Sequence, residues 1–224
     1  MHTIYREMTR PPERLLDGFR DLLTQYSPSC LVTDAQCRTG AIGGLLPVKP
    51  EHRVVGPALT VNLAIDDLVD CMPVLARAQP GDVLVLACHG STRTAMWGGL
   101  MSTLSQKAGV AAGIVDGAIR DVDEIRVLDF RVWYRGTVPR PSPTAAHNRT
   151  EPVQVNVPIT IDGQVIAPGD ILVADENGIA VVPAGSADEV LVGARAVVDK
   201  ERLIREKIES GLGVAALLAE FGHL

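Results

Sequence analysis

Large apolar residues recur at helical intervals close to the start of the chain. Within residues 12–26 they fall one, three or four positions apart, at Leu15, Leu16, Phe19, Leu22 and Leu23. This spacing places them on one face of a helix. Pro28 follows soon after as a stop signal. We therefore predict an N-terminal helix over residues 12–26.

The middle of the chain alternates between strand-like and helix-like patterns. Residues 53–63 are rich in β-branched side chains, and residues 83–88 and 110–115 are continuous apolar runs typical of strands buried on both faces. Helical patterns occupy residues 67–78, 98–107 and 122–128. Because strand and helix alternate, we predict an α/β fold with a partly parallel central sheet and flanking helices.

The pattern changes from Val153 onward. Residues alternate between apolar and polar, and the turn dipeptides are Asp162-Gly163, Pro168-Gly169 and Asn177-Gly178. This predicts antiparallel strands. Asp175 and Glu176 precede the last of these turns, and we interpret them as hairpin residues rather than as a site.

A long amphipathic helix is predicted over Ser186–Ser210, ended by Gly211. Its apolar side could pack inside the monomer or on a neighbouring subunit, and the pattern leaves both open. We expect one domain over residues 1–224, with the N-terminal helix 12–26, a core over 31–183 and a C-terminal helical extension over 186–224.

Composition narrows the class of protein. The 224 residues are 46% hydrophobic and 21% charged, which is typical of a globular protein. The net charge of −6 and the lack of a basic cluster argue against nucleic-acid binding. The four cysteines form no CxxC pair, and no apolar run is long enough to cross a bilayer. We expect a cytoplasmic protein that does not associate with membranes.

A pair of glycines follows the apolar run 83–88, where the next helix begins. Gly98, Gly99, Leu100 and Met101 form this turn. Two glycines let the backbone pass close to a ligand, and the free amides of a helix start attract an anion such as a carboxylate. A tight strand-to-helix turn without any ligand would also use glycine.

Charged residues follow the next predicted strand. Arg120 and Asp121 should emerge at the carboxyl end of a parallel strand, where such sheets bind ligands. A guanidinium can bind a carboxylate through two hydrogen bonds. Asp121 and Glu124 would lie on one helix face and could share a hard cation such as Mg²⁺. The same Asp-x-x-Glu pattern is also that of a capping box, which needs no metal.

The combination resembles the signature of the RraA-like family. Gly99, twenty intervening residues, Arg120-Asp121 and then Glu124 match it, together with the neighbouring GGLM and VDGAIRD. That family includes the regulator of ribonuclease activity A. It also includes class II pyruvate aldolases that act on 4-hydroxy-4-methyl-2-oxoglutarate and 4-carboxy-4-hydroxy-2-oxoadipate.

The resemblance implies a swivelling β/β/α domain that assembles as a homotrimer or homohexamer. It further implies that the backbone of residues 98–101 and the side chain of Arg120 hold a pyruvyl group. Asp121 would hold Mg²⁺ or Mn²⁺ through water. One departure matters: the characterised aldolases have an acidic residue where this chain has Gly99. Glu124 matches an acidic position of other members and could replace it.

The implied activity is a divalent-metal-dependent lyase. It would cleave a carbon–carbon bond of a small 2-oxo acid through a pyruvate enolate, and it would also decarboxylate oxaloacetate. Arg120 and Asp121 are the expected catalytic residues, and the sequence identifies no side chain for the proton transfer. The alternative is a non-catalytic regulator that binds a ribonuclease or another protein.

Four further residues have two interpretations each. Asp116 could orient Arg120 or bond to backbone amides, and His89 could touch a ligand or be structural. Arg93 and Trp97 could shape a pocket entrance or serve packing.

Overall fold

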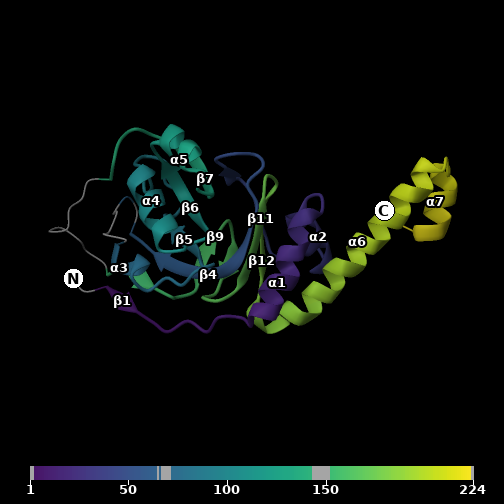
Figure 1. Ribbon diagram of the computed structural model, residues 1–224, viewed down its shortest axis with the longest axis horizontal. Coiled ribbons are helices and arrows are strands. Elements are labelled where there is room, and N and C mark those ends of the chain that lie inside the picture. The colour runs from purple at the N-terminus through teal and green to yellow at the C-terminus, as the bar shows by residue number, and fades with distance from the viewer. Residues whose placement is uncertain (1–2, 65, 67–71, 143–151, 223–224) are drawn as a thin grey trace.

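The computed structural model describes residues 3–64, 66, 72–142 and 152–222. These residues form a curled, partly parallel sheet with helices packed against it (Figure 1). The predicted α/β fold class is therefore confirmed.

The strands and helices are short apart from α6. The strands are β1 Ile4–Tyr5, β2 Ala41–Ile42, β3 Leu46–Pro47, β4 Val54–Asn62, β5 Val83–Ala87, β6 Ala112–Ile119, β7 Val132–Thr137, β8 Gln154–Val155, β9 Ile159–Ile161, β10 Gln164–Ile166, β11 Ile171–Asp175 and β12 Gly178–Val182. The α-helices are α1 Glu13–Asp21, α2 Pro28–Ala35, α3 Met72–Leu75, α4 Gly99–Lys107, α5 Val122–Leu128, α6 Ala187–Glu209 and α7 Val214–Phe221. Two 3₁₀ segments cover Leu22–Thr24 and Ala184–Ser186.

The parallel part of the sheet is its centre. The strand order is β2-β12-β11-β4-β5-β6-β7-β3, and β4, β5, β6 and β7 pair in parallel. Strands β11, β12 and β2 continue the sheet in antiparallel pairing, while β9 and β10 form a separate hairpin. Since parallel strands end at the same edge, the segments after β5 and β6 meet there.

Most predicted elements appear close to their expected positions. The N-terminal helix is α1 followed by a 3₁₀ turn, and Pro28 not only ends this region but begins α2, where a first-turn proline is favourable. Strand β6 runs four residues beyond the expected 110–115, to Ile119. Of the helix expected over 67–78, the structure has α3, and residues 67–71 lie outside the described part.

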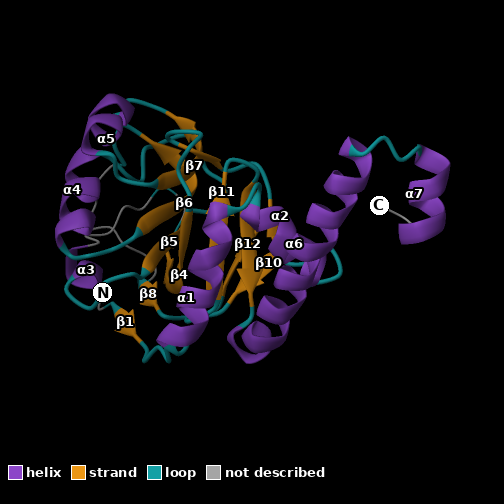
Figure 2. Cartoon of the chain, turned by 45° about the vertical axis from the view of Figure 1, so that its right-hand side comes forward, coloured by secondary structure: helices purple, strands orange, loops and turns teal. Residues whose placement is uncertain are grey.

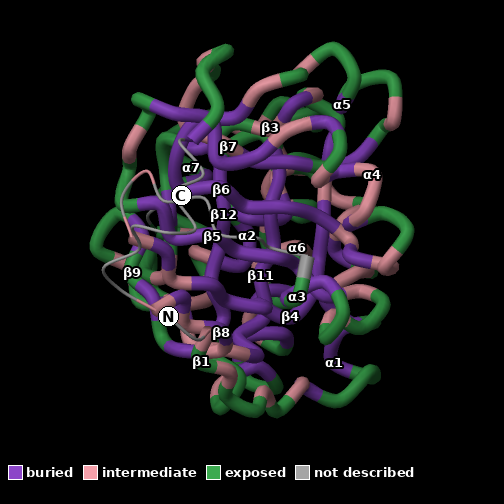
Figure 3. Tube along the Cα trace, turned by 90° about the vertical axis from the view of Figure 1, so that its left-hand side faces the viewer, coloured by how far each residue is buried: buried purple, intermediate pink, exposed green. Residues whose placement is uncertain are grey.

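Three apolar clusters hold the layers together. One lies between the parallel strands and α4 and α5, one fills the inside of the curled sheet, and one joins β11 and β12 to α1, α2 and α6. Figure 2 shows α1, α2 and α6 on one side of the sheet and α4 and α5 on the other. The central strands are buried along their length (Figure 3).

Helix α6 is buried only near its start. Its buried residues are Ala187, Val190, Leu191 and Ala194, and the rest of the helix extends away from the sheet toward α7 (Figure 1). As predicted, the helix ends at a glycine, because Gly211 adopts a left-handed φ of 86°. In the described part of the chain, no helix combines the length and the apolar character needed to span a membrane.

Trp97 packs in the core directly before the glycine turn. Its side chain is 2% exposed and its ring stacks on Phe130, with centroids 6.2 Å apart. Its indole Nε1 donates a hydrogen bond of 2.7 Å to Ser102 Oγ in the first turn of α4. Of the two roles left open for Trp97, the structure supports packing.

We predict that Trp97→Ala lowers the free energy of unfolding by about 3–5 kcal/mol, because it removes a large buried side chain and leaves a cavity. Urea denaturation measures this. Val127→Ala, at a position that is 89% exposed, should change stability by less than about 0.5 kcal/mol. Equal effects of the two substitutions would contradict the packing role.

Candidate functional site

A short ladder of backbone hydrogen bonds joins the two predicted site segments. Met96 N donates to Ala118 O at 2.8 Å, and Arg120 N donates to Trp97 O at 2.9 Å. The segment leading into the glycine turn therefore runs alongside the end of β6. This brings residues 98 and 99 next to Arg120, as the edge of a parallel sheet predicts.

The glycine turn contacts both predicted carboxylates. Gly99 N donates a 3.2 Å hydrogen bond to Asp121 Oδ2. A Cβ atom built on Gly98 would lie 2.6 Å from that same oxygen, and one built on Gly99 would lie 2.0 Å from Glu124 Oε2. Neither position has room for a side chain as the structure stands. Neither glycine has a positive φ, so the requirement is for space.

Glu124 therefore occupies the space into which any side chain at position 99 would extend. Its carboxyl group is the far end of a flexible, exposed side chain, which can shift at little cost. Position 124 supplies the carboxylate, and the absence of a side chain at position 99 leaves the space that this carboxylate occupies. In this chain, glycine at position 99 therefore leaves room for the glutamate at position 124.

Asp121 does not cap its own helix. It is the N-cap residue of α5, with a left-handed φ of 55°, and α5 has no side-chain capping hydrogen bond. The capping-box alternative is therefore wrong for this helix start. The carboxylate turns instead toward the first turn of α4 through Oδ2, and within the part of the chain that the structure describes Oδ1 makes no hydrogen bond or ion pair.

Arg120 lines an open pocket. Its side chain is 41% exposed, and its Nε lies 3.4 Å from Asp121 Oδ2. Among the described residues, no hydrogen bond or ion pair occupies its two terminal nitrogens. The pocket has a volume of about 370 Å³ and is lined by Arg120, Asp121, Val122, Asp123, Thr137, Val138 and Pro139.

Two amides of the glycine turn are also available. Within the described residues, neither Leu100 N nor Met101 N donates a hydrogen bond. Such amides at a helix start carry partial positive charge. The Leu100 side chain is 76% exposed. The glycine turn adjoins the Arg120 side chain, since a Cβ atom built on Gly98 would lie 3.4 Å from Arg120 Nε, but residues 98–101 do not line the pocket of Arg120.

The carboxylates of Asp121 and Glu124 are the candidate ligands for a divalent cation at this turn. In the described residues, no group of three or more His, Cys, Asp or Glu side chains is placed to hold a metal. Two carboxylates suit Mg²⁺ nonetheless, because that ion usually keeps several waters and takes further oxygens from the substrate. The donor chemistry therefore fits a hydrated Mg²⁺ or Mn²⁺ ion.

Asp116 does not orient Arg120. Strand β6 continues past it, so Asp116 is a buried strand residue that pairs with Arg135 on β7 and accepts a 3.0 Å hydrogen bond from Gly90 N. The alternative, bonding to a backbone amide, is confirmed in part. His89 makes a structural contact, since its Nε2 lies 2.8 Å from Leu63 O.

Asp175 is structural, as expected. It ends β11 at the hairpin and is buried, and it accepts hydrogen bonds from Ser29 and Asn177. Arg93 pairs with Asp66 beside a second pocket. Sequence reasoning missed the wall formed by residues 137–142, for which the only signal was the Pro139-Arg140-Pro141 triplet.

Comparison with known proteins identifies the family. The model of the RraA-like family, described as Aldolase/RraA, matches residues 29–181. The chain belongs to the RraA-like family. A Halalkalibacterium halodurans protein, provisionally named as a 4-hydroxy-4-methyl-2-oxoglutarate aldolase, is 32% identical over 207 residues, covering 91% of this chain and 96% of that protein.

Two solved structures share the fold. An uncharacterised protein from Pseudomonas syringae pv. tomato has a TM-score of 0.81 at 28% identity, covering 96% of this chain and 98% of that one. RraAS2 from Streptomyces coelicolor, described as an unusual member of the RNase ES inhibitor RraA family, has a TM-score of 0.74 at 28% identity, covering 89% and 99%.

The far end of α5, the helix that carries Glu124, is anchored by an ion pair. Asp129 ends this helix and bonds to Lys49 and to His52 Nε2, the latter at 3.2 Å. The hydrogen bond from Lys49, followed by that from His52, lowers the pKa of Asp129 from 3.8 to about 2.

A lowered folded-state pKa stabilises the fold above the ordinary value, and this contribution is lost as the pH falls through the folded value. We predict that Asp129→Asn is less stable than the wild type near neutral pH. The difference in the free energy of unfolding between the variant and the wild type should disappear as the pH falls from about 4 to about 2. Urea unfolding at a series of pH values measures it, with Asp123→Asn on the same helix as the control. A difference that persists unchanged at about pH 2 contradicts this role.

Proposed function

We propose that this RraA-like protein is a divalent-metal-dependent lyase that cleaves a carbon–carbon bond next to the carbonyl of a small 2-oxo acid. Its substrates would resemble 4-hydroxy-4-methyl-2-oxoglutarate or 4-carboxy-4-hydroxy-2-oxoadipate, and it would decarboxylate oxaloacetate. The supporting observation is that the glycine turn, whose Leu100 and Met101 amides make no hydrogen bond among the described residues, contacts the Arg120 side chain and the carboxylates of Asp121 and Glu124.

Substrate binding would use the groups that have no partner among residues 3–64, 66, 72–142 and 152–222. The terminal nitrogens of Arg120 would donate two parallel hydrogen bonds to the C1 carboxylate. Within the predicted segment 98–101, the amides of Leu100 and Met101 would hold the rest of the pyruvyl group at the positive end of α4, because Gly99 N already donates to Asp121. The amides are fixed by the first turn of α4, whereas the Arg120 side chain is 41% exposed and loses conformational freedom when it binds.

Bond cleavage needs a sink for electrons. When the C3–C4 bond breaks, its electron pair passes into the C2 carbonyl and forms a pyruvate enolate. In aldol cleavage the C4 hydroxyl loses its proton and the C4 fragment leaves as a carbonyl compound, and in oxaloacetate decarboxylation the C4 carboxylate leaves as CO₂. The enolate then takes up a proton at C3 to give pyruvate. Arg120 would stabilise this negative charge as a fixed cation beside it. A divalent cation, when bound, supplies Lewis-acid stabilisation of the same oxygen. Loss of one such donor costs on the order of 3 kcal/mol, or about a hundredfold in rate.

Asp121 and Glu124 would hold Mg²⁺ or Mn²⁺, with Asp121 acting through water. Glu124 would take the part of the acidic residue that the characterised aldolases have at position 99. The assembly would be a homotrimer or homohexamer in the cytoplasm. The name of the Halalkalibacterium halodurans relative agrees with this reaction class.

A second candidate is a non-catalytic regulator that binds a ribonuclease. The similarity to RraAS2, described as a member of an RNase inhibitor family, favours it. The two functions make opposite predictions for oxaloacetate. The lyase releases pyruvate with Mg²⁺ and stops when a chelator is added, whereas the regulator releases none.

We predict that Arg120→Gln lowers the rate of pyruvate release from oxaloacetate by about a hundredfold or more, because the fixed cation is lost. A coupled pyruvate assay measures the rate, and circular dichroism shows whether the fold is intact. Arg131→Gln, at an exposed arginine before β7, is the matched control. Full activity in Arg120→Gln would rule out the proposed role.

We further predict that Glu124→Gln raises the Mg²⁺ concentration for half-maximal activity by about 10- to 100-fold. The double variant Gly99→Asp with Glu124→Ala should recover much of this loss, because it moves the carboxylate to the position used by the aldolases. Glu189→Gln, on the first turn of α6, is the control. An unchanged Mg²⁺ dependence in Glu124→Gln would exclude Glu124 as a ligand.

A further inference from the structure

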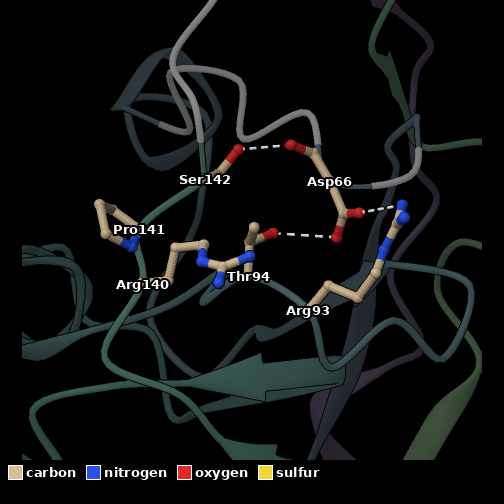
Figure 4. Close-up of a pocket in the computed structure, with 6 residues that line it drawn as sticks. All are labelled: Asp66, Arg93, Thr94, Arg140, Pro141 and Ser142. Carbon is tan, nitrogen blue, oxygen red and sulfur yellow. Dashed lines mark hydrogen bonds and ion pairs between the residues drawn. The ribbon is translucent and has the colours of Figure 1, made fainter.

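Two pockets outside the proposed site carry charged side chains. One is the pocket beside Arg93, where Asp66 bonds to Arg93, Thr94 and Ser142 (Figure 4). Asp66 and Ser142 border residues outside the described ranges. The other, which we name the basic pocket, has a volume of about 490 Å³, and described residues flank every residue that lines it. Its lining residues are Leu23, Lys49, Glu51, His52, Arg53, Asp129 and Arg131.

The basic pocket lies at the edge of the sheet opposite to the proposed site. Arg53 directly precedes β4 and Arg131 directly precedes β7, so both mark the amino ends of strands. Arg120 follows the carboxyl end of β6. Because β4, β5, β6 and β7 run in parallel, these positions belong to opposite edges of the sheet. A ligand in the basic pocket would therefore be separate from the substrate of the proposed site.

Positive charge is in excess in this pocket. Asp129 pairs with Lys49, so the charge of this carboxylate is already neutralised. The guanidinium groups of Arg53 and Arg131 remain, opposed only by the carboxylate of Glu51 among the residues that line the pocket. The chain as a whole has a net charge of −6, so its other surfaces are on average acidic. The basic pocket therefore favours an anion.

Backbone carbonyl groups hold the guanidinium of Arg53 in place. Its Nη1 donates hydrogen bonds of 2.7 Å to Leu23 O and 2.6 Å to Gln25 O. These acceptors are uncharged, so they orient the guanidinium without cancelling its charge. Among the described residues, its Nε and Nη2 atoms make no hydrogen bond or ion pair. A guanidinium oriented in this way can donate two hydrogen bonds to one phosphate or carboxylate group.

Arg131 supplies a second cation. Its side chain is exposed, and in the part of the chain that the structure describes no carboxylate pairs with it. Its backbone is fixed, because its carbonyl accepts a 2.9 Å hydrogen bond from Gly113 N. A phosphate monoester carries a charge of about −1.5 to −2 near neutral pH, whereas a carboxylate carries a single charge. Two guanidinium groups on one pocket therefore match a phosphate group better than a carboxylate.

The size of the pocket indicates a ligand larger than phosphate alone. Its volume of about 490 Å³ lies in the range of pockets that bind small organic molecules. Leu23 adds an apolar side chain to the lining, and Glu51 adds a carboxylate that has no partner among the described residues. An ionised carboxylate only accepts hydrogen bonds, so Glu51 is suited to a hydroxyl group.

We propose that the basic pocket binds a small phosphate ester that carries hydroxyl groups. Arg53 and Arg131 hold the phosphate, Glu51 accepts a hydrogen bond from a hydroxyl group, and Leu23 contacts the carbon atoms. This inference does not depend on the proposed function, because it uses no residue of that site.

Calorimetric titrations of the full chain with inorganic phosphate and with glycerol 3-phosphate test the site. Ionic strength is kept constant, and no divalent metal is added. The wild type should bind one molecule of either compound per chain, and glycerol 3-phosphate should bind more tightly because it also reaches Glu51 and Leu23. Arg131→Gln should weaken both by about 10- to 100-fold, since a charged hydrogen-bonding contact is lost. Arg131→Lys should recover part of this affinity.

Two variants serve as controls, and circular dichroism shows that each variant is folded. Arg120→Gln removes the guanidinium of the proposed site, and Arg202→Gln removes an exposed arginine on α6. Both should bind the two compounds as the wild type does. The inference is overturned if the wild type shows no saturable binding, if Arg131→Gln binds as tightly as the wild type, or if Arg120→Gln loses binding. Glycerol 3-phosphate bound no more tightly than inorganic phosphate also overturns it.

Discussion

The site depends on the pairing between residues 95–97 and the end of β6. Two backbone hydrogen bonds, from Met96 to Ala118 and from Arg120 to Trp97, fix the glycine turn beside the arginine. Without this pairing, the amides of the turn and the guanidinium would sit on separate loops. The ring of Trp97 is buried and stacks on Phe130, which stabilises the same segment. Core packing and site geometry are therefore linked at Trp97.

Side chains at positions 99 and 124 would occupy the same space beside the glycine turn. Gly99 has no side chain, and the Glu124 carboxylate lies where one would begin. A protein with an acidic residue at 99 would need a smaller or displaced residue at 124. In this chain the acidic group near the turn comes from α5 and not from the turn itself, and this sets the direction from which a cation would be held.

Local patterns predicted local structure well. The bounds of α5 were predicted at 122–128 because the helix has its own periodicity and charged first turn, and the meeting of the two site segments followed from the rule that parallel strands end at one edge. The partner of Asp116 could not be predicted, because it depends on the register between β6 and β7. The wall formed by residues 137–142 could not be predicted either, since its position depends on the bridge between Pro141 and Ala95, which no local pattern reveals.

The most direct test of the account is a crystal structure of the protein with oxalate and Mn²⁺, whose anomalous signal locates the metal. The account predicts oxalate within hydrogen-bonding distance of Arg120 and of the amides of residues 99–101, with the Mn²⁺ peak beside Asp121 and Glu124. Oxalate bound away from this turn, or a Mn²⁺ peak held by other residues, would contradict it.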